Sequence, residues 1–426
     1  MSEKKSAWLA YSIIIVAALG YFVDIYDLIL FNVVKKESLE VLMAGQAEDL
    51  RNSTAQFLFN MQMTGMLVGG VLWGIWGDKR GRLSVLFGSI LLYSIANVVN
   101  AFVQTIPVYA LVRFIAGVGL AGELGAGITL VSESMSKEKR GYGTMIIVTF
   151  GALGAVVAAL VGAKGEVIGQ QLTKLFGAPF ANWQVAYILG GVLGLCLLML
   201  RIGTLESGMF KNVQQQDVQR GNILMLFNNW ERFKKYLYCI LVGIPVWYFI
   251  GLIIANSQAT WAAELQVQGQ VINGTSLMYA YLGLSAGDLI CGLISQVWGS
   301  RRKVVLVYLA LSFVLLTYYL FFAKGISLNG FYLLCFLIGA ATGYWAIFVT
   351  IAAEQFGTNI RSTVTNTVPN FVRGSVPLIV LLFNFIKPST GNVVSAYVVG
   401  LLCLALAAFA IFQSPETFAK DLDYAE

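Results

Sequence analysis

Six ionisable side chains lie inside long apolar stretches of this 426-residue chain, where a charge is costly and usually functional. They are Asp24, Asp27, Arg113, Glu123, Asp288 and Arg373. The sequence contains no histidine, so a proton that is bound and released within these stretches would have to be carried by a carboxyl group. The approach or departure of a cation changes how readily a carboxyl group holds its proton. These residue types therefore indicate chemistry that involves protons and anions.

The acidic pair Asp24 and Asp27 is spaced to lie on one face of a helix, because residues i and i+3 are neighbours there. Asp24 lies near the middle of its apolar stretch, and we predict that it carries a proton. A structural ion pair with Arg113 is the alternative. Asp27 lies nearer the end of the stretch and is a second proton-coupling or gating candidate. Glu123 is an equally good proton site, and it lies about 15 Å along a helix from Arg113, too far to pair with it there.

Arg373 is a cation deep in an apolar stretch of the second half of the chain. A guanidinium is a planar fork that suits a carboxylate or a phosphate, so we predict that Arg373 anchors an anionic substrate. A salt bridge with Asp288 is the alternative, and a substrate anion could displace Asp288 from it. The remaining candidates for the substrate site are Asp288 itself, a second cation, two amides and two aromatic side chains: Asp288, Arg113, Asn366, Asn370, Trp345 and Tyr248.

The apolar stretches identify an integral membrane protein. Hydrophobic residues make up 58% of the chain, charged residues 12%, and the mean hydropathy is +0.75. A soluble domain carries about 25% charged residues. Twelve stretches are long enough to cross a bilayer as helices. We predict an all-α membrane fold with helices over residues 7–34, 54–76, 83–104, 107–132, 141–165, 183–204, 236–258, 275–298, 303–323, 328–352, 363–387 and 391–413.

The placement of Lys and Arg predicts the orientation of these helices. Basic residues are concentrated in the alternate connections that lie inside if the N-terminus is cytoplasmic, which favours an even number of crossings of the cell (inner) membrane and two cytoplasmic ends. The longer outer connections, 35–53 and 165–183, suggest no specific function. We predict an N-terminal bundle over 1–205, a polar cytoplasmic linker over 206–235 and a C-terminal bundle over 236–426.

Two landmarks repeat along the chain. The glycine-rich turn Gly77–Arg82 has a weaker copy at Gly299–Lys303, which begins 222 residues later. Two acid–base pairs repeat with nearly the same offset, each with a spacing of seven residues: Glu133 with Arg140, and Glu354 with Arg361. These landmarks indicate a duplicated protein whose halves form a parallel repeat, with a cavity at their interface that opens to one side at a time.

The turn and the fourth helix resemble motifs of the major facilitator superfamily. The run Gly77-Asp78-Lys79-Arg80-Gly81-Arg82 is similar to the superfamily's loop between helices two and three, and Arg113–Gly119 (RFIAGVG) to its fourth-helix motif. The resemblance implies two six-helix bundles, alternating access, and a latch in which Asp78 accepts backbone N–H groups of the eleventh helix. In the second copy Ser300 replaces the acid, so we expect a weaker latch there. The gating candidates are Gly77, Asp78, Arg82, Glu133, Arg140, Glu354 and Arg361.

Two further stretches are similar to proton symporters of that superfamily. Gly20–Asp27 (GYFVDIYD) resembles the first helix of phosphate and aromatic-acid symporters, and Gly119–Gly125 (GLAGELG) resembles the fourth helix of metabolite symporters. The resemblance implies a proton-coupled symporter that imports a small anionic metabolite. Proton-driven efflux of amphipathic compounds and a sugar or polyol carrier are the alternatives.

Other functional classes are not favoured. The sequence has no nucleophile motif and no cluster of metal-ligating residues, so we predict that the protein is not an enzyme and needs no cofactor or metal. The net charge of +6 follows from membrane topology and does not indicate nucleic-acid binding. The predicted partners are a small-molecule substrate, protons and the lipid bilayer, with the protein as a monomer.

Overall fold

A computed structural model describes residues 3–176, 180–202 and 218–426, and these segments are almost entirely helical. The first half of the chain contains α1 (Glu3–Leu42), α2 (Glu48–Arg80), α3 (Arg82–Asn100), α4 (Ile106–Leu120), α5 (Glu123–Ser134), α6 (Arg140–Phe176) and α7 (Asn182–Leu200). The second half contains η1 (Ile223–Leu226), α9 (Trp230–Tyr248), η2 (Phe249–Ile253), η3 (Ile254–Asn256), η4 (Ser257–Trp261), α10 (Ala262–Glu264), α11 (Asn273–Trp298), α12 (Arg301–Phe321), α13 (Leu328–Ala341), α14 (Trp345–Gln355), α15 (Arg361–Gly374) and α16 (Val376–Gln413).

The described helices make twelve membrane crossings, as predicted. Eleven continuous helical segments are long and apolar enough to span a bilayer, and the last of them, Arg361–Gln413, has 53 residues. One crossing needs about 20 residues, so this segment is long enough for two. Gly391 divides it, because its φ of 78° is a left-handed conformation that interrupts α16.

Several helices are longer than predicted, because hydropathy detects only their apolar middle. The predicted connection 35–53 is mostly helical, since α1 ends at Leu42 and α2 begins at Glu48. In the same way α6 extends through most of the predicted connection 165–183. The helix α9 begins inside the predicted linker 206–235, and residues 206–217 of that linker lie outside the described residues.

Two predicted helices, 107–132 and 328–352, are each broken in the middle. α4 ends at Leu120 before α5 begins, and α13 ends at Ala341 before α14 begins. Each break has a glycine against a neighbouring helix: a Cβ on Gly122 would lie 2.8 Å from Ser89 Cβ, and one on Gly343 would lie 2.6 Å from Gly287 Cα. The two breaks occupy equivalent positions in the repeat, and sequence patterns of apolar residues do not indicate them.

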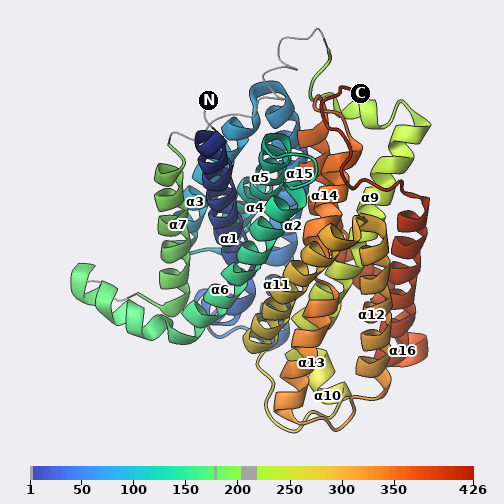
Figure 1. The fold of residues 1–426 in the computed structure, drawn as a ribbon. Coiled ribbons are helices and arrows are strands. Elements are labelled where there is room, and N and C mark those ends of the chain that lie inside the picture. The colour runs from blue at the N-terminus through green and yellow to red at the C-terminus, as the bar shows by residue number, and fades with distance from the viewer. Residues whose placement is uncertain (1–2, 177–179, 203–217) are drawn as a thin grey trace.

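The two halves of the chain form two bundles that lie side by side (Figure 1). The main contacts between them are made by α2 with α15 and by α6 with α11. Both marked ends of the chain lie at the same end of the molecule, which we call the terminal face (Figure 1). The boundary between the two bundles is therefore formed by helices that bear or adjoin the repeated motifs.

Candidate functional site

A cavity of about 790 Å³ lies between the two halves. It is lined by the end of α1, the start of α2, the irregular segment η2–η4, the start of α11 and the start of α16. These parts lie away from the terminal face, so the cavity opens at the opposite face. Its lining residues include Gly251 and Val376, and Val376 follows Arg373 by three residues. The cavity thus approaches the predicted anion anchor from one side of the membrane.

Arg373 is buried at the end of α15, with two indole rings beside its guanidinium. Its Cζ atom is 5.9 Å from the ring centres of both Trp247 and Trp345. Nη1 donates to Oδ1 of Asn370 at 3.3 Å, and Nη2 donates to the hydroxyl of Tyr21 at 3.4 Å. Nε has no hydrogen-bond partner within the described residues. This cation therefore has aromatic faces around it and hydrogen-bonding capacity that the protein leaves unused.

Asp24 faces Arg373 across the boundary between the halves. Its Oδ2 lies 3.8 Å from Nη2 of Arg373, and both residues are almost completely buried. Neither carboxylate oxygen has a hydrogen-bond partner among the described residues. The alternative that paired Asp24 with Arg113 is wrong in this structure, because the counter-ion comes from the other half of the chain. A buried ion pair held this loosely does not satisfy either charge well.

Asp288 does not form the salt bridge with Arg373 that the sequence allowed. Its Oδ1 accepts the backbone N–H of Ala346 at 2.8 Å, at the start of α14. The break between α13 and α14 exposes N–H groups inside the membrane, and an anion at a helix N-terminus satisfies them. The alternative that paired Asp288 with Arg373 is therefore wrong in this structure, because the sequence did not reveal that break.

Arg113 has its contacts within the first half. It donates to the amide oxygen of Gln62 and, at 3.4 Å, to the hydroxyl of Tyr187. Its Cζ lies 4.3 Å from the ring centre of Phe31. The structure therefore does not bring Arg113 and Arg373 into one substrate site.

Asp27 is buried in the first half, one helical turn from Asp24. Gly190 lies against its Oδ1, and the side-chain amide of Asn97 lies near the same glycine. Its carboxylate makes no ion pair with Arg373. A role for Asp27 in proton coupling stays a prediction.

Glu123 is held by a partner that sequence analysis did not identify. Its Oε2 lies 2.5 Å from Nη2 of Arg201, and its Oε1 accepts from Nη1 of Arg201 at 2.8 Å and from Ser89 at 2.9 Å. Arg201 follows α7 directly and is fully buried. A basic residue at the end of an apolar stretch normally marks the membrane boundary. The sequence signal that could have prompted a search for this partner is that Arg113, on the same apolar stretch, is too far along the helix to pair with Glu123.

The amides and the tyrosine of the predicted substrate site have other contacts. Asn370 Nδ2 donates to the backbone oxygen of Ala121, in the other half, at 2.9 Å. Asn366 lies against Gly125, also in the other half. The hydroxyl of Tyr248 donates to the backbone oxygen of Ala396 at 2.6 Å within the second half. Of this set, Asn370 alone contacts Arg373 among the described hydrogen bonds.

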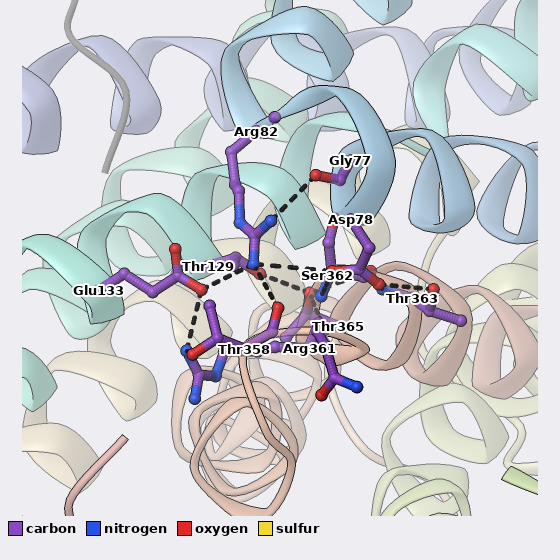
Figure 2. Close-up of polar contacts among 12 residues, drawn as sticks. Gly77, Asp78, Arg82, Thr129, Glu133, Thr358, Arg361, Ser362, Thr363 and Thr365 are labelled. Carbon is purple, nitrogen blue, oxygen red and sulfur yellow. Dashed lines mark hydrogen bonds and ion pairs between the residues drawn. The ribbon is translucent and has the colours of Figure 1, made fainter. Parts of the chain in front are cut away.

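Asp78 joins the two halves at the terminal face, as the family resemblance implied (Figure 2). Its carboxylate accepts the backbone N–H groups of Ser362 at 2.9 Å and Thr363 at 2.8 Å, and the hydroxyl of Thr363 at 2.7 Å. These groups belong to the first turn of α15, where the helix dipole favours an anion. Gly77 packs against Ser362 with no space for a side chain.

Glu133 extends this contact by binding two arginines from different halves (Figure 2). Its Oε1 accepts from Nη2 of Arg82 at 2.8 Å and from Nη1 of Arg361 at 2.9 Å. Arg82 also donates to the backbone oxygen of Thr358 at 2.8 Å. All four residues are buried. We call the set around Asp78, Arg82, Glu133, Arg361 and Thr363 the interhalf latch.

Among the described hydrogen bonds and ion pairs, the second copy of the motif makes none between the halves, although the guanidinium of Arg301 lies against Gly141 of the first half. Ser300 donates to Oε2 of Glu416 at 2.5 Å, and Glu416 also accepts the backbone N–H of Arg301 at 2.9 Å. Glu354 lies 3.3 Å from Arg301 and accepts from Thr417 at 2.8 Å. All five residues belong to the second half, and we call them the C-terminal brace. Arg140, the remaining gating candidate, is buried, and its Nε and Nη1 have no hydrogen-bond partner among the described residues.

Known proteins and one family model match this chain over most of its length. The family model described as Major Facilitator Superfamily matches residues 8–368. The 3-(3-hydroxy-phenyl)propionate transporter of Escherichia coli is 26% identical over 396 residues, which cover 89% of this chain and 92% of that protein. The benzoate transport protein of Acinetobacter baylyi is 24% identical over 406 residues, which cover 85% of this chain and 80% of that protein.

Solved structures share the fold. The proton:xylose symporter XylE matches with a TM-score of 0.80 at 16% identity, over 98% of each chain. The fucose:proton symporter FucP of E. coli matches with a TM-score of 0.69 at 14% identity, over 94% of this chain and 98% of that one. Twelve helices in two bundles and a family match over most of the chain lead to one conclusion: this protein is a membrane transporter that belongs to the Major Facilitator Superfamily.

Proposed function

We propose that this protein is a proton-coupled symporter that imports a small organic anion, and that the substrate class is an aromatic monocarboxylate. The observation that carries the proposal is the loose, buried pair of Asp24 and Arg373 between two indole rings. A carboxylate could replace Asp24 on the guanidinium, and an aromatic ring could pack against Trp247 and Trp345. Two relatives that carry aromatic acids by name support this substrate class.

Charge balance explains how such a site would couple the substrate to a proton. In the empty site the charges of Asp24 and Arg373 compensate each other. A bound carboxylate on Arg373 would leave Asp24 as an uncompensated buried anion, which is strongly unfavourable. Protonation of Asp24 removes that charge, so the loaded site is neutral only when substrate and proton are both bound. The empty site and the site that holds both substrate and proton are neutral, and these are the two states that can change conformation.

The closed terminal face defines the starting state of the transport cycle. With both ends of the chain in the cytoplasm, as the distribution of basic residues favours, the cavity opens to the outside. The interhalf latch then holds the cytoplasmic side closed. Substrate would enter past a mouth that carries three basic and two acidic side chains: Lys35, Lys36, Arg51, Glu40 and Glu48.

The test is uptake of radiolabelled benzoate by proteoliposomes with an imposed pH gradient, acidic outside. We expect accumulation that disappears when the gradient is removed. The Asp24→Asn variant should still exchange benzoate across the membrane but should not accumulate it, whereas Arg373→Lys should lose both activities, because an ammonium lacks the planar fork. Glu231→Gln is the control, since Glu231 is an exposed carboxylate in a surface ion pair.

Two results would overturn the proposal. Benzoate uptake that ignores the pH gradient would remove proton coupling. Binding of xylose but of no aromatic acid, in a thermal-shift comparison, would favour a sugar carrier instead, because a ligand of the folded state raises its apparent stability.

A further inference from the structure

The break in the tenth membrane crossing places helix ends inside the bilayer. α13 ends at Ala341 and α14 begins at Trp345. Because no water is available there, the freed backbone groups need protein partners. At the end of α13 the hydroxyl of Thr342 donates to the backbone oxygens of Ile338 at 3.1 Å and Gly339 at 2.9 Å. The start of α14 needs an acceptor for its N–H groups.

Asp288 of α11 provides that acceptor. Its Oδ1 accepts the N–H of Ala346, the residue after Trp345, at 2.8 Å. Asp288 is completely buried, and its Oδ2 has no hydrogen-bond partner among the described residues. Gly343 lies against Gly287 with no space for a side chain, so the break and α11 touch backbone to backbone. The position of the start of α14 is therefore fixed by α11.

The residue at that position is Trp345, the first residue of α14. Its indole ring centre is 5.9 Å from Cζ of Arg373 and 4.8 Å from the ring centre of Phe348. A displacement of the first turn of α14 would therefore move one of the two aromatic faces beside the guanidinium.

We infer that Asp288 is a positioning residue of the central site: by capping α14 it holds the Trp345 indole beside Arg373, where an aromatic substrate ring would pack. Asp288 touches neither the substrate nor the proton-carrying group in this scheme. The inference about the substrate rests on the proposed function, but the placement of Trp345 by Asp288 does not. The two can therefore be tested separately.

The placement is tested by ¹⁹F NMR of protein labelled with 5-fluorotryptophan. Loss of one resonance in Trp345→Phe assigns that residue among the nine tryptophans. We expect Asp288→Leu, which has no acceptor, to shift or broaden the Trp345 resonance. Asp288→Asn keeps an acceptor oxygen and should leave it in place. Ser327→Ala is the matched control, because Ser327 caps α13 by accepting from Gly330, at the other end of the same crossing.

Benzoate transport gives the functional result. In Asp288→Leu the concentration for half-maximal uptake should rise about fivefold, the factor that corresponds to one lost helix cap, with proton dependence retained. Asp288→Asn should restore the wild-type value. Where the leucine variant is not recovered folded, Asp288→Ala serves in its place.

Three outcomes would overturn the inference. An unchanged Trp345 resonance in folded Asp288→Leu or Asp288→Ala would show that Asp288 does not position the indole. An equal shift of the Trp345 resonance in Ser327→Ala would show that the loss of any helix cap in this crossing moves the indole, and that Asp288 has no specific role. Loss of uphill uptake in Asp288→Asn, with the resonance in place, would make Asp288 a proton carrier. Absence of benzoate uptake by the wild type would contradict the proposed function, while the NMR comparison would still decide the placement.

Discussion

The two copies of the glycine-rich motif have taken different roles at the terminal face. In the first copy Asp78 reaches the first turn of α15, so an acid of one half caps a helix of the other. In the second copy Ser300 stands in place of the acid, and α12 is capped by Glu416 from its own half. The interhalf latch has to open whenever the halves separate, whereas the C-terminal brace can stay intact. Among the described hydrogen bonds and ion pairs, the first copy joins the halves at this face and the second does not, so we predict that gating there depends mainly on the first copy.

The largest difference is expected from the two buried glutamates that repeat. Glu133→Gln leaves Arg82 and Arg361 without the carboxylate they share, and breaking a buried ion pair costs about 3–5 kcal/mol. That cost applies only when the halves are closed. Glu354→Gln breaks the pair with Arg301 inside one half, so it should lower the stability of the fold without opening the face.

A disulfide across the boundary measures this difference. Thr129 and Thr365 belong to different halves, and their hydroxyl oxygens are 2.6 Å apart. Cysteines at these two positions, in a background without the five native cysteines, should cross-link rapidly in the closed state. We expect Glu133→Gln to slow cross-linking at least about tenfold, and Glu354→Gln to leave it unchanged while lowering Tm. Equal slowing by both variants would contradict the division into latch and brace.

A smaller effect is expected from the two capping residues. Asp78→Asn keeps one acceptor oxygen but loses the charge, and hydrogen bonds to charged groups contribute about 1.5–3 kcal/mol. Cross-linking of the same cysteine pair should therefore slow, but less than in Glu133→Gln. Ser300→Ala removes one helix cap, worth about 1 kcal/mol, within the second half. It should lower Tm slightly and leave the cross-linking rate as it is; a slower rate would give the second copy a share in the gate.

The features that could be predicted from the sequence are those that depend on local composition or on the repeat. Apolar stretches predicted the twelve crossings, and the family resemblance predicted the contact of Asp78 with the eleventh crossing, now seen at Ser362 and Thr363. Both signals are carried by residues that are near one another in sequence or match a known motif.

The pairings of buried charges could not be predicted, because they depend on how distant helices are placed. Arg201 and Glu123 are 78 residues apart, and Arg201 follows a helix end where a basic residue is ordinary. Asp24 pairs across the halves with Arg373, although Arg113 is nearer to Asp24 in the sequence. Asp288 has its role only because a break inside an apolar stretch creates a helix N-terminus beside it.

The brace should also respond to pH. Burial of Glu416 opposes its ionisation, but hydrogen bonds from Ser300 and from the backbone N–H groups of Arg301, Phe418 and Arg302 outweigh it, and the pKa of Glu416 lies below its ordinary value. A carboxyl group whose pKa is lower in the folded state stabilises that state above the unfolded pKa, and the stabilisation is lost as the pH falls through the folded pKa.

The lowered pKa of Glu416 predicts how the difference in Tm between wild type and Glu416→Gln depends on pH. It should be constant from neutral pH down to about 5, and it should shrink as the pH falls below about 4, because the unfolded pKa of Glu is about 4.3. Melting followed by tryptophan fluorescence in detergent gives the measurement. A difference that grows on acidification would mean that the charge of Glu416 does not support the brace.

The smallest effect is expected from replacing Arg140, although its spacing from Glu133 is the same as that of Arg361 from Glu354. Arg140 and Arg361 each follow a glutamate by seven residues, yet Arg361 donates to Glu133 at 2.9 Å and to the backbone oxygen of Leu422 at 2.6 Å, while Nε and Nη1 of Arg140 have no partner among the described residues. Arg361→Gln should therefore lose the latch. Arg140→Gln removes a buried cation whose Nε and Nη1 make no hydrogen bond among the described residues, so it should lower stability less than Arg361→Gln does. If Arg140→Gln slowed cross-linking of the cysteine pair as much as Arg361→Gln does, Arg140 would contribute to holding the halves closed, and the gate would extend beyond the interhalf latch.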